Sequence, residues 1–283
     1  MKHNKGIKII LITIIAIIFA AVPAPAKALA AASATATVKS EAGNGTLGFK
    51  DGTADQALFS FPYDMAFDKA GGLIIVDSYN NRIRLLKDNQ VTTIAGGEDL
   101  ISSSGLPITG YADGAALDAR FNHPRGVSVD SKGNIYISDT ENNCIRIITG
   151  GKVYTFAGTR IAGYLDAKDK KAQFNLPSGM AIDKEDNLYI ADTLNNVIRK
   201  ISPGGEVTTF AGKYSEVGGY QDGIAKEAQF NEPSDLAVDS LGTVYVVDSG
   251  NQLVRKIKDG VVSTVAGVSS NDIPNTPYAK VGF

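Results

Sequence analysis

The sequence predicts an all-β fold built from four copies of one repeating sheet, and three observations support this prediction. A segment centred on proline recurs four times along the chain, at Pro62, Pro124, Pro177 and Pro233. Each copy contains short runs of β-branched and alternating apolar residues between turn formers, a pattern typical of antiparallel strands. A Gly-aromatic-x-Asp segment separates consecutive copies. We therefore expect one β domain made of stacked sheets.

Each copy contains four predicted strands. In the second copy they cover residues 126–130, 135–139, 145–149 and 153–158, with turns at 131–134 and 140–143. Four antiparallel strands make one blade of a β-propeller, and a sheet this small must stack on its neighbours to bury both faces. The expected blades, within a propeller covering residues 31–267, are 44–96, 97–158, 159–212 and 213–267.

A short crossover leads into each blade. Its repeated Gly-aromatic-x-Asp segment occupies residues 48–52, 110–114, 163–167 and 219–223, and Ala-rich residues follow it. We predict one helical turn after each segment, with the Asp as its N-cap. The aromatic residues at both ends of the crossover should pack it against the sheets.

The first thirty residues have the pattern of a signal peptide. Lys2, Lys5 and Lys8 precede an apolar run over residues 9–22, and small residues follow as far as Ala30. A retained membrane anchor needs roughly 18 or more apolar residues, whereas this run is shorter. We therefore predict a signal peptide over residues 1–30 that is cleaved after Ala30, with Ala26 as the alternative site. The mature protein should be secreted or held at the cell surface, with no membrane insertion after cleavage.

Both ends of the predicted propeller suggest an incomplete ring. Residues 35–43 resemble the last strand of each repeat, without three strands of their own, and are predicted to be a lone closing strand. Residues 268–283 resemble the crossover that elsewhere introduces another blade. Exposed apolar faces and unpaired strand edges favour aggregation, so we expect self-association unless further blades are supplied.

Charge and cysteine content exclude several classes of function. The chain has a formal net charge of −2, and loss of residues 1–30 removes four lysines and no acid. Without a basic surplus, the protein lacks the electrostatic signature of nucleic-acid binding. Cys144 is the only cysteine, so no internal disulfide and no Cys-based metal cluster is expected. We interpret Cys144 as a half-buried packing residue.

The third copy carries a family resemblance. Residues 175–183 read Asn-Leu-Pro-Ser-Gly-Met-Ala-Ile-Asp, and residues 187–199 continue Asn-Leu-Tyr-Ile-Ala-Asp-Thr-Leu-Asn-Asn-Val-Ile-Arg. This sequence resembles an NHL repeat of the type found in bacterial secreted or cell-envelope proteins. The resemblance implies a β-propeller that binds proteins, glycans or nucleic acid, and a minority of similar propellers are lyases or hydrolases. A fold alone does not decide among these functions.

One polar motif occurs in every repeat. It consists of an Asp, an Asn three residues later and an Arg seven residues later, as in Asp192, Asn195 and Arg199. The motif is compatible with a calcium or ligand site. We favour a structural interpretation, in which Asp and Asn close a turn through backbone N–H groups and Arg pairs with a carboxylate between blades.

Function should be concentrated where the repeats differ. Residues beside the repeated proline and in the second turn of each repeat vary most, and both segments should lie on one face of a propeller. The candidate binding residues are Tyr63, Tyr79, His123, Arg125, Glu141, Glu232 and Asp235. The alternative is an ordinary solvated rim. We predict that this face binds an envelope or extracellular protein, with a glycan as the second choice.

The sequence offers little support for an enzyme. After signal cleavage His123 is the only histidine, whereas a catalytic zinc site takes three protein ligands. No Gly-x-Ser-x-Gly nucleophile motif is present. The second hypothesis is a calcium-dependent hydrolase or lactonase-like enzyme that uses Asp64, Glu232 and Asp235. We therefore predict no catalytic residues and no cofactor, with calcium as the alternative.

Overall fold

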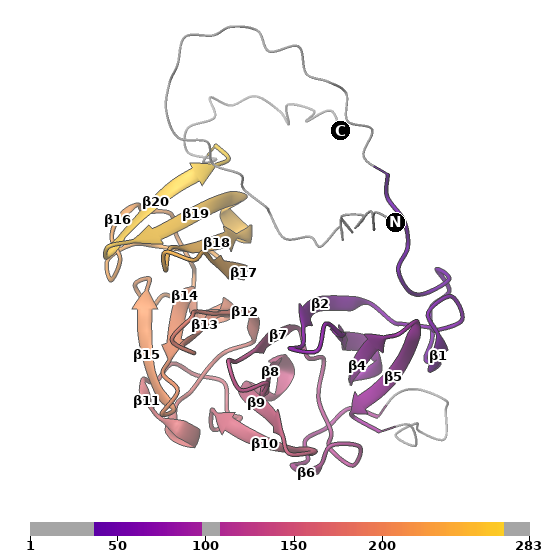
Figure 1. Ribbon diagram of the computed structural model, residues 1–283. Helices are drawn as coiled ribbons and strands as arrows, with labels where there is room; N and C mark the ends of the chain where they lie inside the picture. The colour runs from indigo at the N-terminus through magenta and orange to yellow at the C-terminus, as the bar shows by residue number, and fades with distance from the viewer. Residues whose placement is uncertain (1–36, 98–107, 269–283) are drawn as a thin grey trace, which may run out of the picture. The chain divides into compact units, whose positions relative to one another are not determined.

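A computed structural model describes residues 37–97 and 108–268 of the chain. The described residues form four antiparallel sheets, each of five strands, which are the four blades of a β-propeller (Figure 1). The all-β propeller predicted from the repeats is confirmed.

The four sheets repeat the same sequence of elements. The first contains β1 (Gly52–Thr53), β2 (Pro62–Phe67), β3 (Leu73–Asp77), β4 (Arg82–Lys87) and β5 (Gln90–Ala95). The second contains β6 (Gly114–Ala115), β7 (Gly126–Val129), β8 (Ile135–Asp139), β9 (Cys144–Thr149) and β10 (Lys152–Ala157). The third contains β11 (Ala167–Lys168), β12 (Pro177–Ile182), β13 (Leu188–Asp192), β14 (Val197–Ile201) and β15 (Glu206–Ala211). The fourth contains β16 (Gly223–Ile224), β17 (Pro233–Val238), β18 (Val244–Asp248), β19 (Leu253–Lys258) and β20 (Val261–Ala266).

Strand order places equivalent strands of neighbouring blades next to one another. In the first sheet the order is β1-β5-β4-β3-β2, and the other sheets repeat it. The inner strands contact one another in chain order, from β2 to β7, β12 and β17. A 3₁₀ helix joins the second and third long strands of each blade, at Ser78–Asn80, Thr140–Asn142, Thr193–Asn195 and Ser249–Asn251.

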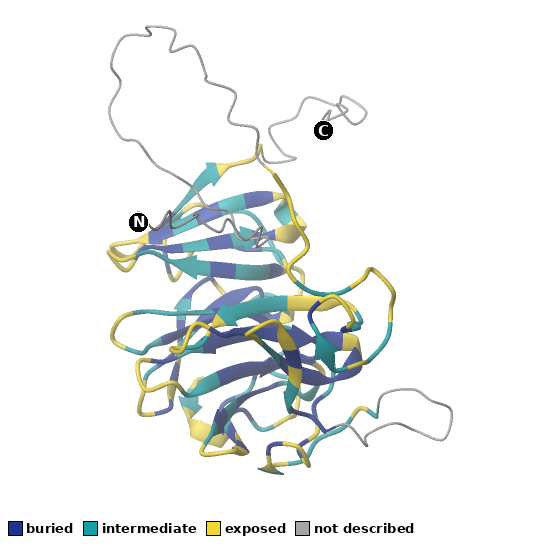
Figure 2. Cartoon of the chain, turned by 45° about the vertical axis from the view of Figure 1, so that its right-hand side comes forward, coloured by how far each residue is buried: buried dark blue, intermediate teal, exposed yellow. Residues whose placement is uncertain are grey.

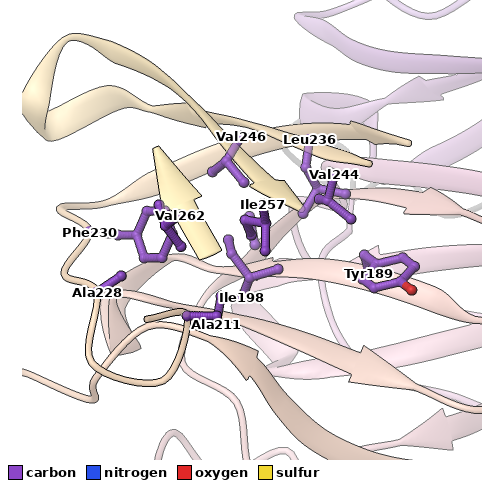
Figure 3. Packing of buried hydrophobic residues seen from close by; sticks show 12 residues of the cluster. Tyr189, Ile198, Ala211, Ala228, Phe230, Leu236, Val244, Val246, Ile257 and Val262 are labelled. Atoms are coloured by element: carbon purple, nitrogen blue, oxygen red, sulfur yellow. The ribbon is translucent and has the colours of Figure 1, made fainter. Parts of the chain in front are cut away.

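The core lies between the blades. Separate clusters of buried apolar residues join blades 1 and 2, blades 2 and 3, and blades 3 and 4. In the last of these, Ile198 from β14 packs toward Val246 and Ile257 of the fourth blade (Figure 3). Buried residues follow the strands and exposed residues follow the turns (Figure 2). Both faces of an inner blade are therefore buried, as the stacking argument requires.

The crossovers differ from the prediction. We expected four-stranded blades and a helical turn N-capped by Asp, whereas residues after the Asp form a fifth strand of two residues. Gly52 of β1 pairs with Val91 of β5, and the other crossovers pair likewise. Only the third crossover carries a short 3₁₀ helix, Asp169–Lys171, and no side chain caps it. The carboxylate of Asp51 instead accepts a hydrogen bond from the Thr93 amide, 2.7 Å away.

The ends of the chain are described only in part. Residues 37–43 pair with no other strand in the described part of the chain, and the closing strand predicted over 35–43 stays a prediction. The Gly43 amide donates a hydrogen bond to the Ala54 carbonyl at 2.7 Å. The predicted signal peptide lies outside the described residues, as does the predicted final crossover apart from Val268.

Among the described residues, no helix has the length and apolar character needed to cross a membrane.

Candidate functional site

The Asp-Asn-Arg motif forms a buried network inside each blade. Asp192 accepts hydrogen bonds from the Asn175 amide at 2.8 Å, from the Asn195 side chain at 2.8 Å and from Arg199 at 2.7 Å. Arg199 also donates to Asp166 of the crossover at 2.6 Å. The side chains of Asp192 and Arg199 are fully buried. Three protein donors therefore occupy the carboxylate, which fits the structural interpretation of the motif.

The same network fastens every crossover to its blade. The four arginines, fully buried in each case, are Arg84, Arg146, Arg199 and Arg255. Each lies between aromatic rings of the crossover, and Arg146 lies 4.6 Å from the ring centre of Tyr111 and 5.2 Å from that of Phe121. Because every blade contains this arrangement, it supports the fold and does not distinguish one face of the protein.

The residue before each repeated proline adopts a left-handed conformation. The φ angles are 48° at Phe61, 45° at His123, 50° at Leu176 and 48° at Glu232, which is uncommon for residues other than glycine. An Asn of the preceding blade holds the amide in three of these cases. The Asn81 side chain accepts from the His123 amide at 2.8 Å, and Asn143 and Asn196 serve Leu176 and Glu232 in the same way. These hydrogen bonds fix the backbone at the variable positions whatever side chain is present there.

The first two blades carry a continuous group of polar and aromatic side chains at this position. Phe61 and Tyr79 of blade 1 have ring centres 4.6 Å apart, and His123 and Glu141 of blade 2 have an N–O distance of 3.0 Å. The Tyr79 ring meets the His123 ring edge-on, with 5.0 Å between ring centres, across the interface between blades 1 and 2. We call the interface between two neighbouring blades a joint.

A second contact crosses the same joint. The Arg125 guanidinium lies 5.0 Å from the centre of the Tyr63 ring. We use the name rim patch for the resulting group, which consists of Phe61, Tyr63, Tyr79, His123, Arg125 and Glu141. Phe61 and Tyr63 are each 54% exposed, and Tyr79 is 50% exposed.

Blades 3 and 4 have no equivalent of this patch. Serines stand in place of Tyr63 and Arg125, and the buried Ser178 hydroxyl donates to the Ser234 carbonyl at 2.7 Å. Glu232 and Asp235 belong to blade 4 and stand apart from the patch on blades 1 and 2. The structure thus brings together five of the seven predicted binding residues, and whether they bind a partner stays a prediction. Phe61 was not among the seven, although its column in the repeats already varied.

Two inner-strand acids bear on the calcium hypothesis. The Asp64 carboxylate accepts hydrogen bonds from the Met65 amide at 2.7 Å and from the Val127 amide of blade 2 at 2.8 Å. Burial, with a smaller contribution from the negative charge of Asp235, raises the pKa of Asp64 to about 7. Both Asp64 oxygens therefore serve backbone amides. Within the described ranges, no group of three or more His, Cys, Asp or Glu side chains is placed to hold a metal ion.

The opposite ends of the inner strands line a cavity that the sequence did not indicate. Its volume is about 340 Å³, and Phe67, Val129 and Ile182 form its apolar part. Asp130 and Asp183 stand at its border, where each accepts hydrogen bonds from its own turn. Asp130 and Asp183 recur in the repeats as turn residues, so their hydrogen bonds at this cavity belong to the structure of the turns.

Comparison with known proteins supports the repeat assignment. The family model for the NHL repeat matches residues 121–148 and 230–257. Teneurin-3 of Danio rerio is 32% identical over 231 residues, which are 73% of this chain and 8% of that protein. The Arabidopsis thaliana protein SUPPRESSOR OF QUENCHING 1, chloroplastic, is 36% identical over 131 residues, 45% of this chain and 12% of its own length. This chain therefore spans a small part of both relatives.

Solved structures also match this chain at low sequence identity. An auxiliary nutrient binding protein from Bacteroides ovatus is 20% identical, with a TM-score of 0.48 over 74% of this chain and 60% of that chain.

Proposed function

Because the chain is a β-propeller with NHL repeats, we propose that it is an exported scaffold that binds a protein partner through the rim patch. The observation that supports this proposal most is the asymmetry of the repeats. Three half-exposed aromatic rings gather on blade 1, where they contact His123 and Arg125 of blade 2, whereas blades 3 and 4 have small serines directly after the repeated proline.

The composition of the rim patch suits a protein partner. Aromatic and arginine side chains contribute most of the free energy at protein interfaces, and the patch combines Phe61, Tyr63 and Tyr79 with Arg125. The His123–Glu141 pair borders these rings and supplies polar groups at the edge. A rim of polar side chains around an apolar centre is the usual arrangement of an interface.

The rigidity of the patch also favours binding. The His123 amide is held by Asn81, and the rings of Phe61 and Tyr79 contact each other. Side chains that are already fixed lose less conformational entropy when a partner binds. Export rests on the predicted signal peptide, and the proposed location is therefore the cell surface or the surrounding medium.

Site-specific photo-crosslinking tests the proposal. A photoreactive phenylalanine analogue replaces Tyr79 in the full chain, and the protein is exposed to an envelope fraction of the source cells under light. We expect one discrete crosslinked product. This product should be missing when the envelope fraction has been digested with protease before it is mixed with the propeller. Unlabelled natural protein in excess should abolish the product, whereas the unlabelled double variant Tyr63→Ala, Arg125→Ala should not.

A matched control uses Leu241, which is 80% exposed in the turn between β17 and β18. The analogue at Leu241 should yield no such product. If both positions give the same products, or if the double variant competes as well as the natural protein, the rim patch is not the binding surface. A product that survives protease and disappears after glycosidase treatment would assign the patch to a glycan.

A further inference from the structure

Three joints between successive blades share one set of contacts at their outer edge. The fourth long strand of each of the first three blades, which is β5, β10 or β15, ends in a fully buried alanine. These alanines are Ala95, Ala157 and Ala211. The following glycine donates its amide hydrogen to the next crossover, as from Gly96 to the Ala116 carbonyl at 2.9 Å and from Gly212 to the Ala225 carbonyl at 2.7 Å. Each blade thus ends by bonding to the crossover of the next blade.

The same joints share two further contacts nearer the centre. A residue in left-handed conformation at the end of the 3₁₀ helix presents an amide side chain to the next blade, as Asn81 does to the His123 amide. A branched apolar residue of the third long strand is fully buried against the next blade, namely Ile83, Ile145 or Ile198. Each of the first three blades therefore packs against the next blade through the same set of contacts.

The fourth blade repeats these features without a successor among the described residues. Ala266 is exposed where its three counterparts are fully buried, and Val254 is only half-buried where the three isoleucines are inaccessible. Gln252 is exposed in the left-handed position of Asn81, with φ of 58°. Asp235 occupies the position in the fourth repeat that Asp64 occupies in the first. Asp64 accepts a hydrogen bond from the next blade, whereas in the part of the chain that the structure describes the Asp235 carboxylate accepts one only from the neighbouring Leu236 amide, at 2.8 Å.

We propose that the outward side of blade 4 binds a further NHL-type blade together with its crossover. The crossover would offer a backbone carbonyl to the Gly267 amide, as Ala116 does to Gly96. The inner strand of the docked blade would offer backbone amides to Gln252 and to Asp235. Burial of Val254 and Ala266 would complete an apolar joint like those between the existing blades.

Blade 1 of a second copy does not fit this description. The Ala54 carbonyl, which corresponds to Ala116, already accepts a hydrogen bond from the Gly43 amide of its own chain. In addition, residues at the repeat position of Asp64 lie very close to one another in neighbouring blades. A Cβ added at Gly179 of blade 3 would lie 2.2 Å from an Asp235 oxygen of blade 4. Docking blade 1 would therefore bring the Asp64 and Asp235 carboxylates together. The occupant is a separate blade with its own free crossover.

Cysteine labelling of an extended chain tests this proposal. The extended chain has a second copy of residues 97–158 placed directly after Gly267. Blade 2 is chosen because it follows blade 1, whose Asp64 occupies the same repeat position as Asp235 of blade 4. Ala266→Cys is made in the natural chain and in the extended chain, and its reaction with a maleimide is timed. We expect at least roughly tenfold slower labelling in the extended chain, since a buried thiol reacts only after local opening.

Matched controls separate docking from other effects. Leu241→Cys should react equally fast in both chains, and Cys144, which is fully buried, supplies the background. Gln252→Ala in the extended chain should restore labelling of Ala266→Cys in part. Equal labelling of Ala266→Cys in both chains overturns the proposal, and so does an appended blade that stays unfolded by hydrogen exchange. Slower labelling of the natural chain at higher protein concentration would instead identify a second copy as the occupant.

Discussion

At the scale of single residues, buried charge pairs stabilise the blades, whereas the exposed aromatic rings are the residues proposed to bind a partner. Asp192 is fully buried against Arg199. In Asp192→Ala the Arg199 guanidinium keeps Asp166 as a partner, but the buried donors of Asn175, Asn195 and Arg199 lose their shared acceptor. The free energy of unfolding should therefore fall by about 1–3 kcal/mol. Urea denaturation measures this loss, with the exposed Lys184→Ala as the control. A loss below about 1 kcal/mol would show that the network does not support the blade.

Arg125 represents the opposite case. It is only partly buried, and its guanidinium contacts the Tyr63 ring. Because a cation–π contact at such a site contributes about 0.5–1 kcal/mol, Arg125→Ala should change the free energy of unfolding by less than about 1 kcal/mol. The same variant should weaken the Tyr79 crosslink described above. A large loss of stability together with a normal crosslink would reverse the roles assigned to this residue.

At the scale of elements, close contact between inner strands depends on glycine. A Cβ at Gly126 of β7 would lie 2.3 Å from the Ser178 carbonyl oxygen of β12. Gly126→Ala should therefore force the two blades apart and destabilise the protein by about 1–3 kcal/mol. Gly204→Ala is the matched control, because its nearest neighbour would be 3.7 Å away. Thermal unfolding of both variants checks the prediction, which equal midpoints would contradict.

The sequence predicted the long strands because their alternation and turn residues recur in every repeat. It did not predict the two-residue strand of each crossover, since two residues carry no periodicity and an Asp before Ala-rich residues also suits a helix N-cap. The variable positions in the repeats named seven candidate binding residues, five of which lie together in the structure, and whether they bind a partner stays a prediction. Which of them meet depends on contacts across a joint, such as that between Tyr79 and His123, and no spacing in the chain encodes those contacts.

At the scale of the whole molecule, the joint between blades 1 and 2 should make stability depend on pH. The pKa of Asp64 is about 7 in the folded protein, against about 3.9 in an unfolded chain. The folded state therefore binds more protons between these values. The Asp64 contribution is fully present below about pH 4 and is lost as pH rises through about 7.

Asp64→Asn should remove this part of the pH dependence. Urea midpoints of the natural protein and the variant are compared across the range from about pH 4 to about pH 8. We expect the difference between the two profiles to change with pH, because the other buried acids contribute equally to both. Two parallel profiles would mean that Asp64 does not titrate in this window.

The left-handed residue before each repeated proline has a consequence for how this protein can change over time. Neighbouring Asn side chains hold the backbone amides of His123, Leu176 and Glu232, and this contact does not depend on which side chain the held residue carries. Evolution can therefore exchange these side chains without rebuilding the blade beneath them. For the same reason, a combinatorial library at these positions would sample new recognition surfaces on an unchanged frame.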